Sequence, residues 1–263
     1  MKLDILHQPA AQKRHSTPIL LVHGLWAGTW AWKENFMPYL SQAGYDVYAV
    51  SLRGHENSEG KERLQTTRLG EYVQDVQQAV SSLPEKPILI GHSNGGIVVQ
   101  KYLQQHTLPA AVLLGTMPIS GSLMTFLRGL KNDPALFLKV TFTFNLQHLV
   151  GTPERARTAF FSSTLPADKV NRYFGQMNRE SFVAFLDTLF VQMDPRKMKT
   201  PLLVLGAEND FFFTPAQVQQ TAKAYGTTAH IFPNMAHAMM LEDGWQQVAD
   251  HILKWLDTQP AAR

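Results

Sequence analysis

Short apolar runs alternate with longer amphipathic stretches along most of the chain. Several runs contain no polar residue, as in Ile19–Val22 and Leu202–Leu205, and strands have this pattern when helices cover both faces of a parallel sheet. The runs predict strands at Lys2–Leu6, Ile19–Val22, Asp46–Val50, Ile88–Ile90, Ala110–Leu114, Leu202–Leu205 and Thr228–Phe232. The stretches between them predict helices at Trp32–Gln42, Leu69–Ser82, Gly96–Gln105, Pro215–Ala224 and Trp245–Leu256. Together these elements predict an α/β fold with a mostly parallel central sheet flanked by helices.

The region from Met117 to Met198 interrupts this alternation. It contains no convincing strand, yet it carries 10 of the 15 Phe residues. One set of apolar side chains in it follows the i, i+3, i+4, i+7, i+8 spacing of a helix with one apolar face: Phe182, Phe185, Leu186, Leu189 and Phe190. Unstructured loops of this length are uncommon in compact domains. We therefore expect a helical insertion at 117–198 in a core formed by residues 1–116 and 199–263.

The composition narrows the class of protein. Hydrophobic residues make up 44% of the chain and charged residues 17%, which excludes a disordered chain. The net charge of +3 is too small for a nucleic-acid footprint, and no apolar run is long enough for a membrane span. With 0 Cys, thiol catalysis and cysteine-ligated metal sites are excluded. The N-terminal stretch has no apolar centre of a secretion signal, so we expect a soluble cytoplasmic protein.

The strongest chemical signal is the segment Gly91–Gly96, with the sequence Gly-His-Ser-Asn-Gly-Gly, directly after a predicted strand. Gly-x-Ser-x-Gly between a strand and a helix is the nucleophile-elbow pattern. It places the hydroxyl of Ser93 above the sheet on a strained turn, and the glycines allow neighbouring backbone to pass close by. The pattern predicts Ser93 as a nucleophile.

A serine nucleophile needs a base and an acid that orients the base. Asp210 follows a buried predicted strand, at the sheet edge where open α/β proteins build their sites. Glu208 in the same loop is the competing carboxylate. His237 lies in the loop after the last predicted strand, so the chain order is Ser93, Asp210, His237.

Preorganised amide donors are needed to stabilise the negative oxygen of a tetrahedral intermediate. The amide of Asn94, directly after the nucleophile, is one candidate donor. The other lies in the loop after Ile19–Val22, where Leu25 is favoured and Trp26 is the alternative. We expect His23 to hold this loop through its ring nitrogens.

Taken together, these motifs resemble the α/β-hydrolase superfamily over nearly the whole chain, with 117–198 at the place where members insert a variable cap. The resemblance implies a cofactor-free hydrolase of the esterase, lipase or lysophospholipase kind. One departure is Glu56, where members with a related arginine-glycine-histidine loop often carry glycine. No metal-ligand spacing and no dinucleotide fingerprint is present, so we expect no cofactor and no metal.

The expected reaction is hydrolysis of a small-molecule ester through an acyl-enzyme, by a monomer or homodimer. The aromatic content of the insertion indicates a hydrophobic acyl or aromatic substrate. Candidate pocket residues are Trp26, Trp30, Leu123, Phe126, Leu127 and Met239. The same residues would also serve a lyase or an acyltransferase, and a low-turnover ligand-binding relative of the same fold is a further alternative.

Overall fold

The computed structural model describes residues 1–259, and a seven-stranded sheet forms the centre of this part of the chain. The strand order is β1-β3-β2-β4-β5-β6-β7. Only β1 runs antiparallel to its neighbour; the other pairs are parallel. The strands are β1 (Asp4–Gln8), β2 (Ile19–Val22), β3 (Val47–Ser51), β4 (Ile88–His92), β5 (Ala111–Leu114), β6 (Leu202–Ala207) and β7 (Ala229–Phe232). The predicted fold class is confirmed.

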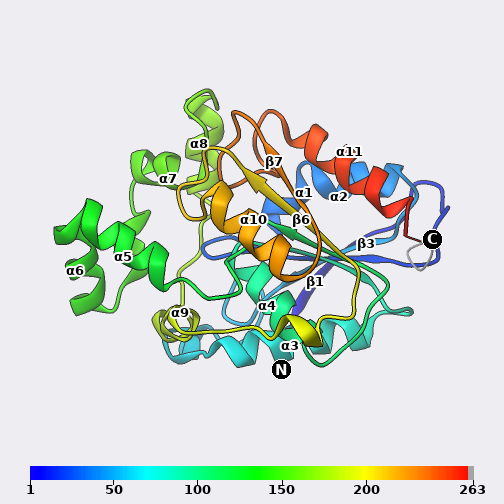
Figure 1. Ribbon diagram of the computed structural model, residues 1–263, viewed down its shortest axis with the longest axis horizontal. Coiled ribbons are helices and arrows are strands. Elements are labelled where there is room, and N and C mark those ends of the chain that lie inside the picture. Colours follow the sequence, from blue (N-terminus) through cyan, green and yellow to red (C-terminus); the bar gives the residue numbers. More distant parts are fainter. Residues whose placement is uncertain (260–263) are drawn as a thin grey trace.

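Helices cover both faces of the sheet (Figure 1). Along β2, Ile19 and Leu21 pack into one apolar cluster while Leu20 and Val22 pack into the other, because successive side chains of a strand point to opposite faces. One cluster includes α1 (Trp30–Lys33), α2 (Phe36–Gln42) and α11 (Trp245–Leu256). The other includes α3 (Leu69–Ser82), α4 (Asn94–Leu103) and α10 (Pro215–Ala224). The residues of β2 and β5 are therefore all apolar and buried, as the runs in the sequence indicate.

Residues 117–198, called the inserted segment below, connect β5 to β6 and contain no strand in the structure. Figure 1 shows α5 and α6 beyond one end of the sheet, with α9 beside α3. The helices of this segment are α5 (Leu123–Asn132), α6 (Pro134–Thr143), α7 (Pro153–Phe160), α8 (Ala167–Phe174) and α9 (Phe182–Leu189). None of the helices within residues 1–259 combines the length and apolar character that crossing a bilayer requires.

Two local predictions are wrong. The helix predicted at Trp32–Gln42 is divided into α1 and α2, because Pro38 has no N–H to bond to the carbonyl of Glu34 and its ring would clash there. The apolar face predicted for α9 is only partly buried: Phe182 is 5% exposed, but Leu186 is 42% and Phe190 is 72% exposed. The helix buries Phe182 and Leu189 of the predicted face, together with the small residues Ala184 and Thr188.

Candidate active site

Ser93 occupies the sharp turn between β4 and α4. Its backbone angles, φ 53° and ψ −119°, lie outside the regions that non-glycine residues favour. A Cβ on Gly95 would lie 2.4 Å from the carbonyl oxygens of Val22 and His23, and one on Gly91 would lie 2.7 Å from the carbonyl oxygen of Gly95. Both positions therefore require glycine. The turn has the geometry of a nucleophile elbow, and Ser93 lines a cavity.

Asp210 and His237 form a hydrogen-bonded pair at the same edge of the sheet. Nδ1 of His237 lies 2.8 Å from Oδ2 of Asp210, and both side chains are 0% exposed. Oδ1 of Asp210 accepts from the amides of Phe212 and Phe213 at 2.8 and 2.9 Å, so the carboxylate has a fixed orientation. The competing Glu208 is exposed and accepts from the amide of Asn234 instead.

The end of β5 lies between Ser93 and this pair. The amide of Ser93 donates to the carbonyl of Leu114 at 3.0 Å. The next residue is Gly115, where an added Cβ would lie 3.6 Å from both Oδ2 of Asp210 and Nδ1 of His237. Three loops that are distant in the sequence thus meet around one strand end.

The second ring nitrogen of His237 is available for chemistry. Nε2 is buried and has no hydrogen-bond partner within residues 1–259, so no bond joins it to the Ser93 hydroxyl in this structure. The ring is enclosed by Phe160, Phe212 and Phe213, with ring centroids 4.8 to 5.8 Å away. Nε2 of His92 donates to the carbonyl of His237 at 3.0 Å, which fixes the loop. Burial and the proximity of His237 hold the pKa of His92 well below its ordinary value.

The loop after β2 passes directly over the elbow. A Cβ on Gly24 would lie 2.8 Å from Cβ of Ser93. His23 holds this loop, as expected: Nδ1 donates to the carbonyl of Gly24 at 2.9 Å, and Nε2 accepts from the amide of Leu52 at 3.0 Å. Burial lowers the pKa of His23 to about 3, so the ring is neutral and this tautomer is the only one that satisfies both bonds.

The two candidate oxyanion donors differ in their bonding. The amide of Trp26 donates to the carboxylate of Glu180, whereas the amide of Leu25 has no acceptor within the described residues. The amide of Asn94 is at the first position of α4, where helix geometry provides no acceptor. Leu25, rather than Trp26, therefore has its N–H free for a ligand beside Ser93, with which it lines the same cavity.

Glu56 has a structural role that explains its departure from glycine. Its carboxylate accepts from the amides of Thr29 and Trp30 at 2.5 and 3.4 Å, at the start of α1. Gly28 makes room for it, since a Cβ there would lie 2.4 Å from the Glu56 carboxylate. Sequence reasoning missed this bond and the role of Glu180, because nothing local to either residue indicates its distant partner.

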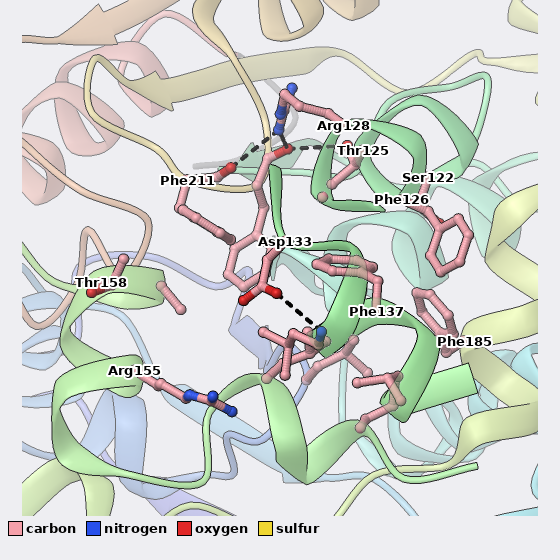
Figure 2. A pocket seen from close by; sticks show the side chains of 18 of the residues that line it. Ser122, Thr125, Phe126, Arg128, Asp133, Phe137, Arg155, Thr158, Phe185 and Phe211 are labelled. Atoms are coloured by element: carbon pink, nitrogen blue, oxygen red, sulfur yellow. Dashed lines mark hydrogen bonds between the residues drawn. The ribbon is translucent and has the colours of Figure 1, made fainter. Parts of the chain in front are cut away.

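An apolar cavity of about 460 Å³ opens between Ser93 and the inserted segment. Figure 2 shows Phe126, Phe137 and Phe185 on one wall, with ring centroids of neighbouring pairs 5.5 and 6.1 Å apart. Arg128 lies at another side, where its guanidinium donates to the carbonyls of Phe211 and Phe212. Trp26 and Phe126, both predicted for the pocket, belong to this lining.

Four other residues predicted for the pocket lie elsewhere. Met239 is 0% exposed in the core, and Leu127 is 45% exposed because it is on the outer face of α5. Trp30 faces Tyr173, at 6.1 Å between ring centroids, and lines a separate void of about 20 Å³. Leu123, at the start of α5, is not part of the lining either. The apolar pattern indicated suitable elements here but not the direction of each side chain.

No group of three or more His, Asp or Glu side chains that could hold a metal ion is found within residues 1–259. What the site does offer is a hydroxyl on a strained turn, an oriented imidazole and two free amides. This set of groups is suited to nucleophilic acyl chemistry.

The fold and the site agree with a family match. A model of the alpha/beta hydrolase family matches residues 19–251, so the chain belongs to that family. Polyneuridine aldehyde esterase from Rauvolfia serpentina is 29% identical over 128 residues, which are 48% of this chain and 43% of that protein. Salicylic acid-binding protein 2 from Nicotiana tabacum is 38% identical over 109 residues, 38% of this chain and 40% of that protein. The chain thus spans less than half the length of these relatives.

A solved structure extends the likeness to the whole chain. The esterase from Exiguobacterium antarcticum superposes with a TM-score of 0.75, covering 97% of this chain and 96% of that one. The two sequences are 15% identical, so the likeness concerns the fold.

Proposed function

We propose that this protein is a serine hydrolase that cleaves carboxylic esters through an acyl-enzyme intermediate, with Ser93, His237 and Asp210 as the catalytic triad. The observation that carries the proposal is the 2.8 Å bond from Nδ1 of His237 to Asp210, which leaves Nε2 buried and unpartnered beside the elbow. In unliganded enzymes the bond from the nucleophile to the base is often loose and tightens with substrate. The esterase named among the relatives supports the same reaction class.

In the first half of the reaction, Oγ of Ser93 attacks the carbonyl carbon of the ester as Nε2 of His237 takes the hydroxyl proton. The carbonyl oxygen becomes negative and accepts hydrogen bonds from the amides of Leu25 and Asn94, each worth about 3–4 kcal/mol in the transition state. Asp210 holds the imidazole in the required tautomer and stabilises its protonated form. His237 then donates the proton to the leaving alcohol.

In the second half, a water molecule attacks the acyl-enzyme while His237 removes its proton. The second tetrahedral intermediate uses the same two amides. Its collapse releases the acid and returns the proton to Ser93. No cofactor is needed for either half.

The apolar cavity indicates the substrate class. Its volume of about 460 Å³ is in the range of small-molecule pockets, and its aromatic wall favours a hydrophobic acyl chain or an aromatic group. We further propose that the inserted segment acts as a cap over the site, since it provides most of this lining.

Labelling with a fluorophosphonate probe tests the nucleophile. The wild-type chain should be labelled and should hydrolyse p-nitrophenyl esters, and Ser93→Ala should lose the label and about 10⁴-fold or more of kcat. Unchanged thermal unfolding of the variant is the control for folding. An active Ser93→Ala variant would refute the triad. A wild type that binds esters but takes no label would instead favour the ligand-binding alternative.

A chain-length series tests the pocket. Esters from acetate to octanoate should show a kcat/KM that rises beyond acetate. Leu136 lines the cavity, whereas Leu138 on the same helix is 47% exposed and is not part of the lining. Leu136→Trp should therefore move the preference to shorter chains, and Leu138→Trp should leave it unchanged. A steady fall from acetate to octanoate in the wild type would contradict an acyl pocket here.

A further inference from the structure

A buried carboxylate of the inserted segment contacts the loop that carries the oxyanion donor. Glu180 precedes α9 and is 3% exposed. One of its carboxylate oxygens accepts from the amide of Trp26 and lies 3.0 Å from Nε2 of His55. Neither Glu180 nor His55 takes part in the proposed proton transfers, so their burial needs another explanation.

The bonding of His55 fixes its charge. Nδ1 lies 3.0 Å from the carbonyl oxygen of Arg53 and Nε2 faces the Glu180 carboxylate, so each ring nitrogen faces an acceptor and both are donors. That is the protonated form of the ring. Burial alone would lower the pKa of His55, but the charge of Glu180 and its hydrogen bond overcome this and raise it. Glu180 and His55 therefore form a buried hydrogen-bonded pair.

The same few residues hold the backbone of Trp26 at both its N–H and its carbonyl. While Glu180 accepts from the Trp26 amide, the amide of Asn178 donates to the Trp26 carbonyl at 2.8 Å. The side chain of Asn178 donates to the carbonyl of Ala27 at 3.0 Å. Trp26 itself has φ 59°, a left-handed conformation that is unfavourable for a tryptophan unless its surroundings impose it.

This arrangement decides which amide of the loop remains free. With the Trp26 N–H committed to Glu180, the N–H of Leu25 is the one left without an acceptor within residues 1–259. If Glu180 were absent, the N–H of Trp26 would have no fixed acceptor, so Trp26 could leave its left-handed conformation and the adjoining backbone of Leu25 could move with it.

We infer that Glu180 is a positioning residue: its carboxylate, paired with His55, locks the loop so that the Leu25 amide points at the developing oxyanion. The inference rests on the proposed function. It assigns to the inserted segment a part in completing the catalytic geometry, in addition to lining the pocket.

The test compares Glu180→Leu, which removes the acceptor at similar volume, with Glu180→Gln, which keeps an oxygen that can accept more weakly. Asp187→Leu is the matched control: Asp187 also docks the inserted segment on the core, through Arg68 and Leu69, but does not contact the oxyanion loop. The readouts are kcat and KM for a p-nitrophenyl ester and Ki for phenylboronic acid. This inhibitor forms a tetrahedral adduct with serine and mimics the intermediate.

Loss of one oxyanion donor lowers kcat by about 10²–10³-fold, so we expect Glu180→Leu to lose about 10²-fold in kcat with KM within about threefold. Its Ki for the boronic acid should rise by a similar factor. Glu180→Gln should lose about 3–10-fold in both, and Asp187→Leu should stay within about twofold in both. If Glu180→Leu does not fold, the parallel loss in Glu180→Gln carries the test.

The inference would be overturned if Glu180→Leu had the kcat and Ki of the wild type. If Glu180→Leu does not fold, the same result in Glu180→Gln would overturn it. So would a fall in kcat with an unchanged Ki, because the loss of an oxyanion donor must also weaken the tetrahedral adduct. These failures differ from failure of the proposed function, in which the wild type itself would hydrolyse no ester and bind no boronic acid.

Discussion

The sheet around the elbow and the inserted segment are built in opposite ways. The side chains of β2 and β5 are all buried, and Gly91 and Gly95 allow backbone to pass against backbone. In the inserted segment, by contrast, α5 has no buried residue, and Phe142 and Phe144 are 77% and 65% exposed. One region is dense and dry, and the other presents apolar side chains to solvent.

This difference separates two tasks. Groups that transfer protons need fixed geometry, which a densely packed scaffold provides. A wall that receives a substrate can be looser, because few buried contacts lower the cost of local rearrangement. The contacts of Glu180 place a buried, hydrogen-bonded point inside the looser region. We therefore expect substitutions at the densely packed sheet edge to lower activity or stability more than substitutions at exposed positions of the inserted segment.

The largest effect is expected at the dense edge. Asp210→Asn keeps the shape of the side chain but favours the wrong tautomer of His237, so kcat should fall by about 10³–10⁴-fold. Glu208→Gln, in the same loop but exposed, should change kcat by less than about threefold. Steady-state kinetics on a p-nitrophenyl ester measures both. Equal losses in the two variants would mean that the loop, not the Asp210 carboxylate, matters.

Next in size is the cost of a single methyl group at the elbow. Gly95→Ala would place a Cβ 2.4 Å from two backbone carbonyl oxygens, which cannot move without the strand, so unfolding should become easier by about 3 kcal/mol or more. Gly70→Ala is the control, because nothing lies within 4 Å of the added Cβ. It should be neutral or stabilising by up to about 1 kcal/mol. Urea unfolding distinguishes the two, and an equally stable Gly95→Ala would contradict dense packing.

Acid should weaken the dense region through its buried neutral histidines. The pKa of His23 is about 3 in the folded chain, against an ordinary value of 6.5 for an exposed ring, so below pH 6.5 the unfolded chain binds a proton that the folded chain does not. Stability is therefore lost as pH falls from about 6.5 toward 3. Each pH unit costs about 1.4 kcal/mol per such histidine. Urea unfolding at pH 7 and pH 5 measures the slope, and His23→Asn should flatten it.

The smallest effect is expected in the inserted segment. Phe142→Ser changes a side chain that is 77% exposed, so the free energy of unfolding should change by less than about 0.5 kcal/mol. Phe36 is 0% exposed in the apolar cluster on one face of the sheet. Phe36→Ala should therefore lower the free energy of unfolding by about 3–5 kcal/mol. Thermal or urea unfolding checks the pair. A large loss in Phe142→Ser would mean that this face is covered in solution.

Local patterns in the sequence carried much of the fold and part of the site. The helices α3, α10 and α11 have the bounds that the pattern predicts, because each has a regular apolar face between clear end signals. The motifs also pointed to Asp210 and His237, which come within hydrogen-bond distance. Such motifs are readable because each depends on a strand end and the few residues after it.

What could not be predicted depends on distant contacts. The Glu180 bond to Trp26 joins residues 154 positions apart, and no local pattern distinguishes this glutamate from a solvated one. The prediction of the pocket lining failed for a related reason: Leu127 is in the inserted segment, as expected, and Trp30 begins α1 rather than lying in the preceding loop, but neither side chain lines the main cavity. Tertiary packing decides how a helix is rotated about its axis. A segment with apolar residues on all sides does not show in its sequence which side will face the cavity.

The position of Trp26 has a practical consequence. Its indole lies in the cavity wall, 5.7 and 6.3 Å in ring centroid distance from Phe160 and Phe212. A molecule entering the cavity would change the surroundings of that ring and so alter its fluorescence emission. Trp26 is therefore an intrinsic fluorescent probe in the wall of the cavity that Ser93 also lines. Ligand binding can be followed through its emission in real time, without an attached dye.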